Sequence, residues 1–134
     1  MFEQQSNLFN LEMSEEAQPL MDAVKKHIHD SVDPITKEFF DLKENREDRW
    51  SWHPRQLELL GGAKAKAKAA GLWNFFLPNT EYGSGLTNLD YAYIAGELGK
   101  SPLASESLNC SAPDTGNMEV LERVGTPEQK EKWL

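Results

Sequence analysis

Few residues in this chain have the type and spacing that catalysis needs. Cys110 is the one cysteine, but no histidine or acid lies at a recognisable spacing to activate its thiol. A lone cysteine is more often a small buried packing residue, which is our interpretation here. His29 and Asp33 could share one face of a helix, whereas His27 would diverge from His29. Because a metal needs at least one further ligand, we interpret both histidines as ordinary surface residues and expect no metal site.

A glycine-rich turn, Gly83-Ser84-Gly85, precedes a helix start in the way that phosphate-binding loops do. It lacks the preceding strand and the full glycine or lysine fingerprint of such loops. The nearest charged residue is the acidic Glu81, so we favour a plain turn over a phosphate-binding regulatory domain. The 22 acidic residues are scattered and form no identifiable catalytic pair. We therefore assign no catalytic residue.

Composition and charge narrow the class of protein. The chain has 134 residues, which is one domain's worth, and we expect a single domain over residues 1–134. The net charge is −8 and basic residues never form a run longer than Lys25-Lys26, which excludes a nucleic-acid footprint. No segment reaches the ~18 apolar residues of a membrane span. Residues 1–5 do not resemble a signal peptide, so we expect an intracellular, soluble domain.

The strongest periodic signal predicts one long helix near the N-terminus. Apolar residues recur at steps of three and four from position 17 to position 42. Ser14 followed by two glutamates is typical of a helix start. Pro34 lies inside the pattern, which continues in phase beyond it. We therefore expect a single helix to about position 43, with a bend near position 30.

Caps and turn residues predict the remaining helices. Residues 54–70 alternate alanine and lysine in part, but both are strong helix formers, and Pro54 and Gly71 fit the two ends of a helix. Residues 87–98 form a third helix that is apolar on most sides and should be sandwiched between others. Residues 103–111 should be a short helix plus turn, and 113–124 a fourth main helix. Thr126-Pro127 starts a last helix.

Apolar side chains between these helices indicate how they pack. Residues 43–52 are charged and aperiodic, which is typical of a loop, and we interpret their two tryptophans, Trp50 and Trp52, as anchors. Leucines at 57, 59 and 60 should join the second helix to the core. The central segment is residues 71–89, and its apolar side chains are each worth about 1.5–3 kcal/mol when buried: Leu72, Trp73, Phe75, Phe76 and Leu77. The expected fold is an all-α, up-down bundle of about five to six helices.

Several strings of the sequence resemble the N-terminal helical domain of the acyl-CoA dehydrogenases. These strings are residues 71–78 (GLWNFFLP), 82–86 (YGSGL), 97–102 (ELGKSP) and 125–134 (GTPEQKEKWL). Their order and spacing match along nearly the whole chain. Residues 109–119 are similar to the branch represented by acyl-CoA dehydrogenase family members 10 and 11. Ser84 departs from the pattern, because many relatives have a second glycine there.

The resemblance implies an oxidoreductase of fatty acid β-oxidation that introduces an α,β double bond into an acyl-CoA. In such flavoenzymes a carboxylate base takes the α-proton, the β-hydride goes to FAD, and an electron-transfer flavoprotein-like partner accepts the electrons. The flavin and the base are held mainly by a middle β-domain and a C-terminal helical domain, which this chain lacks. No residue here matches a flavin-binding motif, so this part alone is expected to be inactive.

The resemblance also implies an oligomeric state and a cellular location for the whole protein. It would be a homodimer or homotetramer, cytoplasmic in a bacterium and mitochondrial or peroxisomal in a eukaryote. The well-capped last helix stops on Trp133 and Leu134 without a C-terminal cap. We therefore expect the natural chain to continue, and expect an apolar patch where a partner domain docks, with Trp133 at that boundary.

The helix at 113–124 has two unlike faces. Its apolar side (Pro113, Asn117, Val120, Leu121 and Val124) should pack into the bundle. The opposite side is mostly small, and spacing alone is equally compatible with a solvated face carrying a Glu119–Arg123 pair. Because the resemblance implies that the domain supplies a wall of the acyl pocket, we predict substrate contacts on this side and its approach, from Ser111, Ala112, Thr115 and Gly116.

A hypothesis from another class is a free-standing helical interaction module whose aromatic cluster binds a partner. Such a module should have a proper C-terminal cap and a polar tail, and the sequence shows neither.

Overall fold

The computed structural model describes residues 11–44, 48 and 50–134, and all regular structure in that part is helical. The elements are α1 (Gln18–His27), η2 (Ile28–Val32), α2 (Asp33–Glu44), α3 (Pro54–Ala69), α4 (Asn88–Leu98), α5 (Ala104–Ser107), α6 (Asp114–Val124) and α7 (Pro127–Trp133). Since α1, η2 and α2 follow one another without a break, the described part contains six helices. The all-α prediction is confirmed. Within the same residues, every helix is too short or too polar to cross a bilayer.

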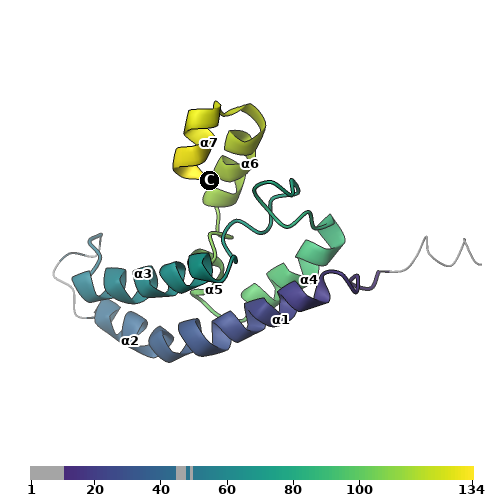
Figure 1. Ribbon diagram of the computed structural model, residues 1–134. Coiled ribbons are helices and arrows are strands. Elements are labelled where there is room, and N and C mark those ends of the chain that lie inside the picture. The colour runs from purple at the N-terminus through teal and green to yellow at the C-terminus, as the bar shows by residue number, and fades with distance from the viewer. Residues whose placement is uncertain (1–10, 45–47, 49) are drawn as a thin grey trace, which may run out of the picture.

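The helices form two groups on either side of the irregular segment 70–87 (Figure 1). The long helix α1–η2–α2 turns back into α3, and α4 and α5 lie against this pair. The yellow-green α6 and α7 form a short hairpin that stands apart from the other helices. The central segment therefore separates the hairpin from the main layer.

The long helix begins later than its capping signal indicates. Ser14 accepts a hydrogen bond from the amide of Ala17 through its Oγ (3.3 Å), but this closes only a turn, and α1 starts at Gln18. The amide of Ser14 instead donates to Asp90 Oδ1 at 2.8 Å, which ties the approaching chain to α4. The predicted cap was thus three residues early, because Ser14 closes a separate turn and proline in the first helical turn favours the later start.

At the predicted bend near position 30 lies a π-helical turn, η2, which ends two residues before Pro34. A proline inside an α-helix removes one hydrogen bond and clashes with the carbonyl four residues earlier. A single wider turn relieves that clash without ending the helix. The continuity of the helix, inferred from the uninterrupted apolar period, is confirmed.

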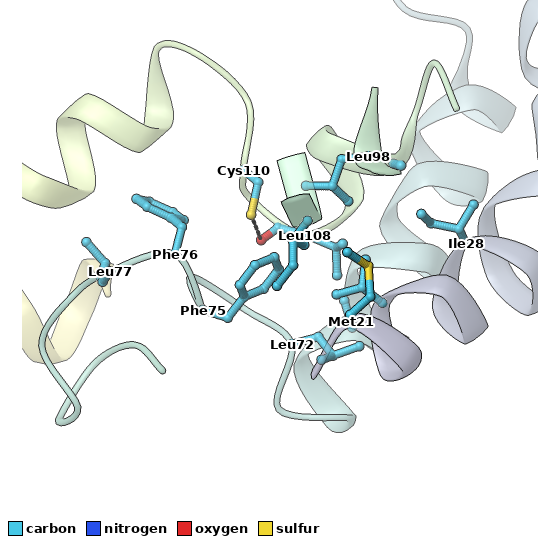
Figure 2. Packing of buried hydrophobic residues seen from close by; sticks show 13 residues of the cluster. Met21, Ile28, Leu72, Phe75, Phe76, Leu77, Leu98, Leu108 and Cys110 are labelled. Atoms are coloured by element: carbon cyan, nitrogen blue, oxygen red, sulfur yellow. Dashed lines mark hydrogen bonds between the residues drawn. The ribbon is translucent and has the colours of Figure 1, made fainter. Parts of the chain in front are cut away.

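The main core is built on the central segment (Figure 2). Leu72, Phe75, Phe76 and Leu77 are buried and pack with side chains from α1, η2, α3, α4 and α5, namely Met21, Val24, Ile28, Ala67, Ile94, Leu98, Ala104, Leu108 and Cys110. Trp73 is the exception among the five predicted side chains. It is only half-buried, and the Lys68 ammonium lies 4.2 Å from its ring centroid.

A second cluster joins α2 to α3 through Val32, Phe39, Leu59, Leu60 and Leu103. Trp52 packs edge-on against Phe39, with ring centroids 5.5 Å apart, as an anchor should. Trp50 is exposed, and Leu57 faces solvent. The predictions for these two side chains were wrong because an apolar residue type alone does not tell which side chains lie beyond the edge of the contact.

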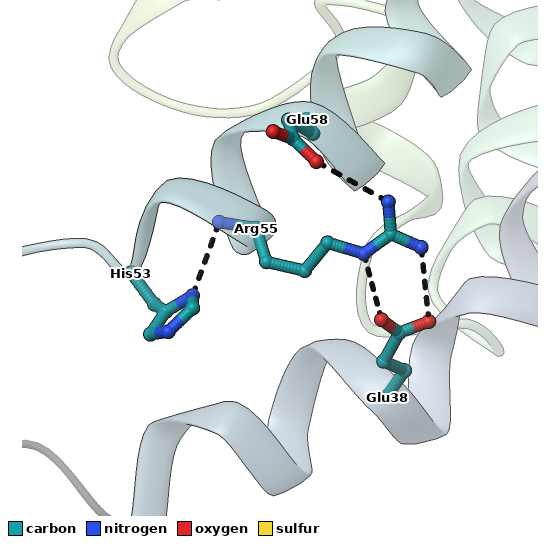
Figure 3. Close-up of polar contacts among 4 residues, drawn as sticks. All are labelled: Glu38, His53, Arg55 and Glu58. Atoms are coloured by element: carbon teal, nitrogen blue, oxygen red, sulfur yellow. Dashed lines mark hydrogen bonds and ion pairs between the residues drawn. The ribbon is translucent and has the colours of Figure 1, made fainter.

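Polar contacts also join α2 to α3 at their connected ends (Figure 3). Arg55 Nε donates to Glu38 Oε1 at 2.8 Å, and its guanidinium also reaches Glu58 at 3.2 Å. The next residue, Gln56, is almost fully buried and donates to the carbonyl of Phe39 at 2.8 Å. His53 caps α3. Because exposed ion pairs contribute little, the buried Gln56 contact is the one that defines the pairing.

Helix α4 buries one face only. Asp90, Ile94 and Leu98 face the core, whereas Tyr93 is exposed. The expected covering of this helix on several sides is therefore not found in the described part of the chain.

Candidate functional site

The predicted substrate-contact residues lie together where the chain leaves the core for α6. Ser111 and Thr115 are half-buried and joined by a backbone hydrogen bond of 3.3 Å, while Ala112 and Gly116 are exposed. A Cβ added to Gly116 would meet no atom within 4 Å. The four residues thus share an open surface at the first turn of α6. Their contact with a substrate stays a prediction.

Two asparagines hold this turn against the central segment, and the sequence analysis did not single them out. Asn74 is 1% exposed and has a φ of 56°, and Asn109 has a φ of 59°. Asn109 Nδ2 donates to Asn74 Oδ1 at 2.6 Å, and Asn74 Nδ2 donates to the carbonyl of Leu134 at 3.0 Å. Asparagine tolerates left-handed backbone better than most residues, and its presence inside an apolar run was the available signal.

The outer face of α6 differs from its prediction. Val120 and Val124 are 61% and 76% exposed, and neither α6 nor α7 has a fully buried residue. With Trp133, which is 60% exposed, they line an apolar groove of about 410 Å³ between α6 and α7. The expected packing of this face into the bundle was wrong, because α6 packs mainly on α7 rather than on the main layer.

Cys110 is a packing residue, as interpreted from the sequence. Its thiol is buried in the main core, with Sγ 3.6 Å from the carbonyl of Leu108 (Figure 2). Burial raises its pKa to about 12. Burial likewise raises the pKa of the neighbouring Tyr91 to about 12. A protonated, enclosed thiol is a poor nucleophile.

His27 is buried, so its interpretation as a surface residue was wrong. Its Nε2 lies 3.1 Å from Ser107 Oγ, which donates its one proton to the carbonyl of Ala104 at 2.8 Å. The imidazole must therefore donate through Nε2. Burial, and then the charge of Lys66, lower the His27 pKa.

His29 remains on the surface and bonds Asp30 at 2.7 Å rather than Asp33. Among the residues that the structure describes, no three histidine, cysteine or acidic side chains are grouped closely enough to hold a metal.

The glycine-rich turn, residues 83–85, is held by backbone contacts within the chain. A Cβ at Gly83 would lie 2.0 Å from the carbonyl oxygen of Leu77, so this glycine permits close approach of the chain to itself. The Gly83 amide donates to Asn79 at 2.7 Å and the Ser84 amide donates to Phe75 at 3.1 Å. These two amides are therefore already bonded within the chain, as the interpretation as a plain turn expects.

Comparison with known proteins shows which family has this sequence and this arrangement of helices. The sequence model of the acyl-CoA dehydrogenase N-terminal domain matches residues 14–134. The chain belongs to the acyl-CoA dehydrogenase family. It is 55% identical over 92 residues to acyl-CoA dehydrogenase family member 10 of Mus musculus, covering 65% of this chain and 8% of that protein. It is 48% identical over 124 residues to family member 11 of Gallus gallus, covering 90% of this chain and 15% of that protein.

A solved structure assigned to the acyl-CoA dehydrogenases, from Mycobacterium abscessus, superposes with a TM-score of 0.71 at 43% identity. It covers 92% of this chain and 31% of the other. The acyl-CoA dehydrogenase matches therefore all place this chain against a minor fraction of a longer protein. The resemblance based on residues 71–134, including the branch of family members 10 and 11, is confirmed.

Proposed function

We propose that this chain is the N-terminal helical part of an FAD-dependent acyl-CoA dehydrogenase, an oxidoreductase that introduces an α,β double bond into an acyl-CoA. The observation that carries the proposal is the family match over residues 14–134. The chain spans only about 15% of family member 11 of Gallus gallus, so the reaction belongs to the longer protein. In this proposal the chain alone is inactive, and an electron-transfer flavoprotein-like partner accepts the electrons.

The role of this part is to supply a wall of the acyl pocket from Ser111, Ala112, Thr115 and Gly116. Their open position at the first turn of α6 supports this role, because nothing in the described chain occupies the space above Gly116. The buried pair of Asn74 and Asn109 would fix the wall against the core. Rigid support of this kind keeps a binding surface in one geometry.

The FAD would be held mainly outside this chain; the bonded amides of Gly83 and Ser84 support this part of the proposal. A second role is an interdomain interface at the groove between α6 and α7. The apolar lining of that groove, with Val120, Val124 and Trp133 exposed, supports it. The whole protein would work as a homodimer or homotetramer, in the cytoplasm of a bacterium or the mitochondrion or peroxisome of a eukaryote, and take part in fatty acid β-oxidation.

The wall is tested by Gly116→Leu in the full-length protein. A Cβ at this position meets no atom within 4 Å, so we expect the fold to tolerate a larger side chain, while the added volume projects toward the proposed acyl chain. We expect kcat/KM to fall by roughly tenfold or more for long-chain acyl-CoA, and by much less for short-chain acyl-CoA. The measurement is the chain-length profile of dehydrogenation, with bound flavin quantified from its absorption.

The matched control is Gly62→Leu on α3. A Cβ added at Gly62 also meets no atom within 4 Å. It should leave the profile unchanged. A Gly116→Leu enzyme with normal flavin content and an unaltered chain-length profile would contradict the proposed contact between this surface and the acyl chain.

A further inference from the structure

A pocket of about 270 Å³ lies between the long helix and the C-terminal end of α3. Its polar lining comes from Lys26, His27, Asp30, Ser31 and Lys66, and its apolar lining includes Ala70 and Leu72. The volume is below the ~300–1,000 Å³ typical of sites for drug-sized ligands. The pocket therefore suits only a small molecule.

One buried polar group in this pocket has no partner. Ser31, in the π-helical turn, is 9% exposed, and its hydroxyl makes no hydrogen bond to any residue that the structure describes. A buried hydroxyl without a partner is costly, so such groups generally bind water or a ligand. Helical turns of the π type are also frequent at functional sites.

The pocket carries an uncompensated positive charge in an otherwise acidic chain. Asp30 is already bonded by Lys26 and by His29. Lys66, on the opposite wall, has no ion pair within the described residues. A lysine without an ion pair thus lies beside an unpartnered hydroxyl in this pocket.

We propose that this pocket binds a small monocarboxylate with a short apolar body. Lys66 and the Ser31 hydroxyl would bind the carboxylate, and Ala70 and Leu72 would contact the body. A charge-assisted contact from a lysine to a carboxylate is stronger than a neutral hydrogen bond. The apolar walls favour this ligand over inorganic phosphate, which has no apolar part to bury. None of these residues belongs to the predicted acyl wall, and the inference does not depend on the function proposed above.

The test uses NMR of the full 134-residue chain with labelled histidine, and hexanoate as the probe. The chain has three histidines, and His27 lines the pocket while His53 lies at the other end of α3. We expect hexanoate to shift the ring signals of His27 in a saturable way and to leave those of His53 in place. Binding should also raise the midpoint of the His27 titration, because the carboxylate offsets the charge of Lys66.

Variants distinguish specific binding of hexanoate in the pocket from non-specific binding to the protein. Lys66→Gln should weaken hexanoate binding by about fivefold, the upper end for one exposed ion pair, and Ser31→Ala should also weaken it. Lys25→Gln, an exposed lysine on α1 that does not line the pocket, should leave the affinity unchanged.

Four outcomes would overturn the proposal. These are an absence of His27 shifts at millimolar hexanoate, equal shifts with hexanol, equal shifts with inorganic phosphate, or equal weakening by Lys25→Gln and Lys66→Gln. Hexanol tests whether the charge matters, and phosphate tests whether the apolar body matters.

Discussion

Cys110 and His27 have reactive side chains whose behaviour is set by burial rather than by residue type. Both lie in the packed interior and bond to neighbouring groups of the same chain. A low-dielectric environment disfavours the charged form, which raises the pKa of the thiol and lowers that of the imidazole. The folded chain therefore holds both groups in their neutral forms near pH 7.

For Cys110 we expect very slow reaction with thiol reagents in the folded protein. With the thiol pKa raised to about 12, thiolate is scarce near pH 8, and burial also blocks the reagent. Reaction with a thiol-specific chromophoric disulfide should be slower than in the urea-unfolded chain by roughly a hundredfold or more. Rapid, stoichiometric labelling of the folded chain would show that Cys110 is accessible.

For His27 we expect a pH dependence of stability. The folded-state pKa is lowered by burial and by Lys66, so the unfolded chain, with a pKa of about 6.5, takes up the proton first as the pH falls. The free energy of unfolding should therefore decrease below about pH 6.5 and level off below the folded-state pKa. Urea unfolding at about pH 7.5 and about pH 5.5 measures the change.

In this comparison His27→Gln should show a smaller loss of stability toward acid than the parent chain. His29→Gln keeps His27 in place and should retain the parent's loss. If all three chains lose the same free energy over this range, the change comes from other groups.

At the scale of elements, the caps after the first helix follow local rules. Thr126 caps α7 through a reciprocal contact with Gln129, and Gly71 ends α3 with a φ of 70°. The connections between elements are less local. Asn74 and Asn109 are 35 positions apart, yet their hydrogen bond joins the central segment to the start of α6.

We expect Asn74→Ala to destabilise the chain by about 2–4 kcal/mol. The substitution leaves the buried amide of Asn109 without its acceptor and places alanine in left-handed backbone. Asn74→Gly should recover the backbone part only, or about 1 kcal/mol. Urea unfolding gives the values, and Asn88→Ala, at an exposed position of α4, should change stability by less than about 0.5 kcal/mol. A cost for Asn74→Ala no larger than that of the control would contradict the role of the pair.

At the scale of the molecule, the α6–α7 hairpin leaves an apolar groove uncovered. Val120, Val124 and Trp133 are each more than half exposed there. Water in contact with such a contiguous apolar surface is displaced favourably by an apolar partner. The groove is thus the surface through which the chain is most prone to associate.

We expect the 134-residue chain to bind a hydrophobic fluorescent dye at this groove. The double substitution Val120→Ser, Val124→Ser should lower the dye signal by roughly half or more, because it replaces most of the exposed aliphatic lining. The free energy of unfolding should change by less than about 0.5 kcal/mol per site, since both residues are exposed. Leu57→Ser, on the surface of α3, is the control and should leave the signal unaltered. A clean monomer in sedimentation that binds no dye would refute the expectation.

The sequence by itself determined the helices, their caps and the burial of most of the central segment. These features depend on residues a few positions apart: Pro54 and Gly71 at the ends of α3, and the apolar run from Leu72 to Leu77. The family could also be identified from the order of short strings, since spacing along the chain is retained in the sequence.

Only the tertiary structure decided which faces are covered. His27 became buried because Ser107, 80 positions away, packs against it, and Val124 became exposed because α6 packs mainly on α7. Period and composition tell that a face is apolar, but its burial requires a partner surface brought from elsewhere in the chain. Long-range contacts decide which surface becomes that partner. For this reason the side chains of Leu57, Val120 and Val124 are exposed although their burial was predicted.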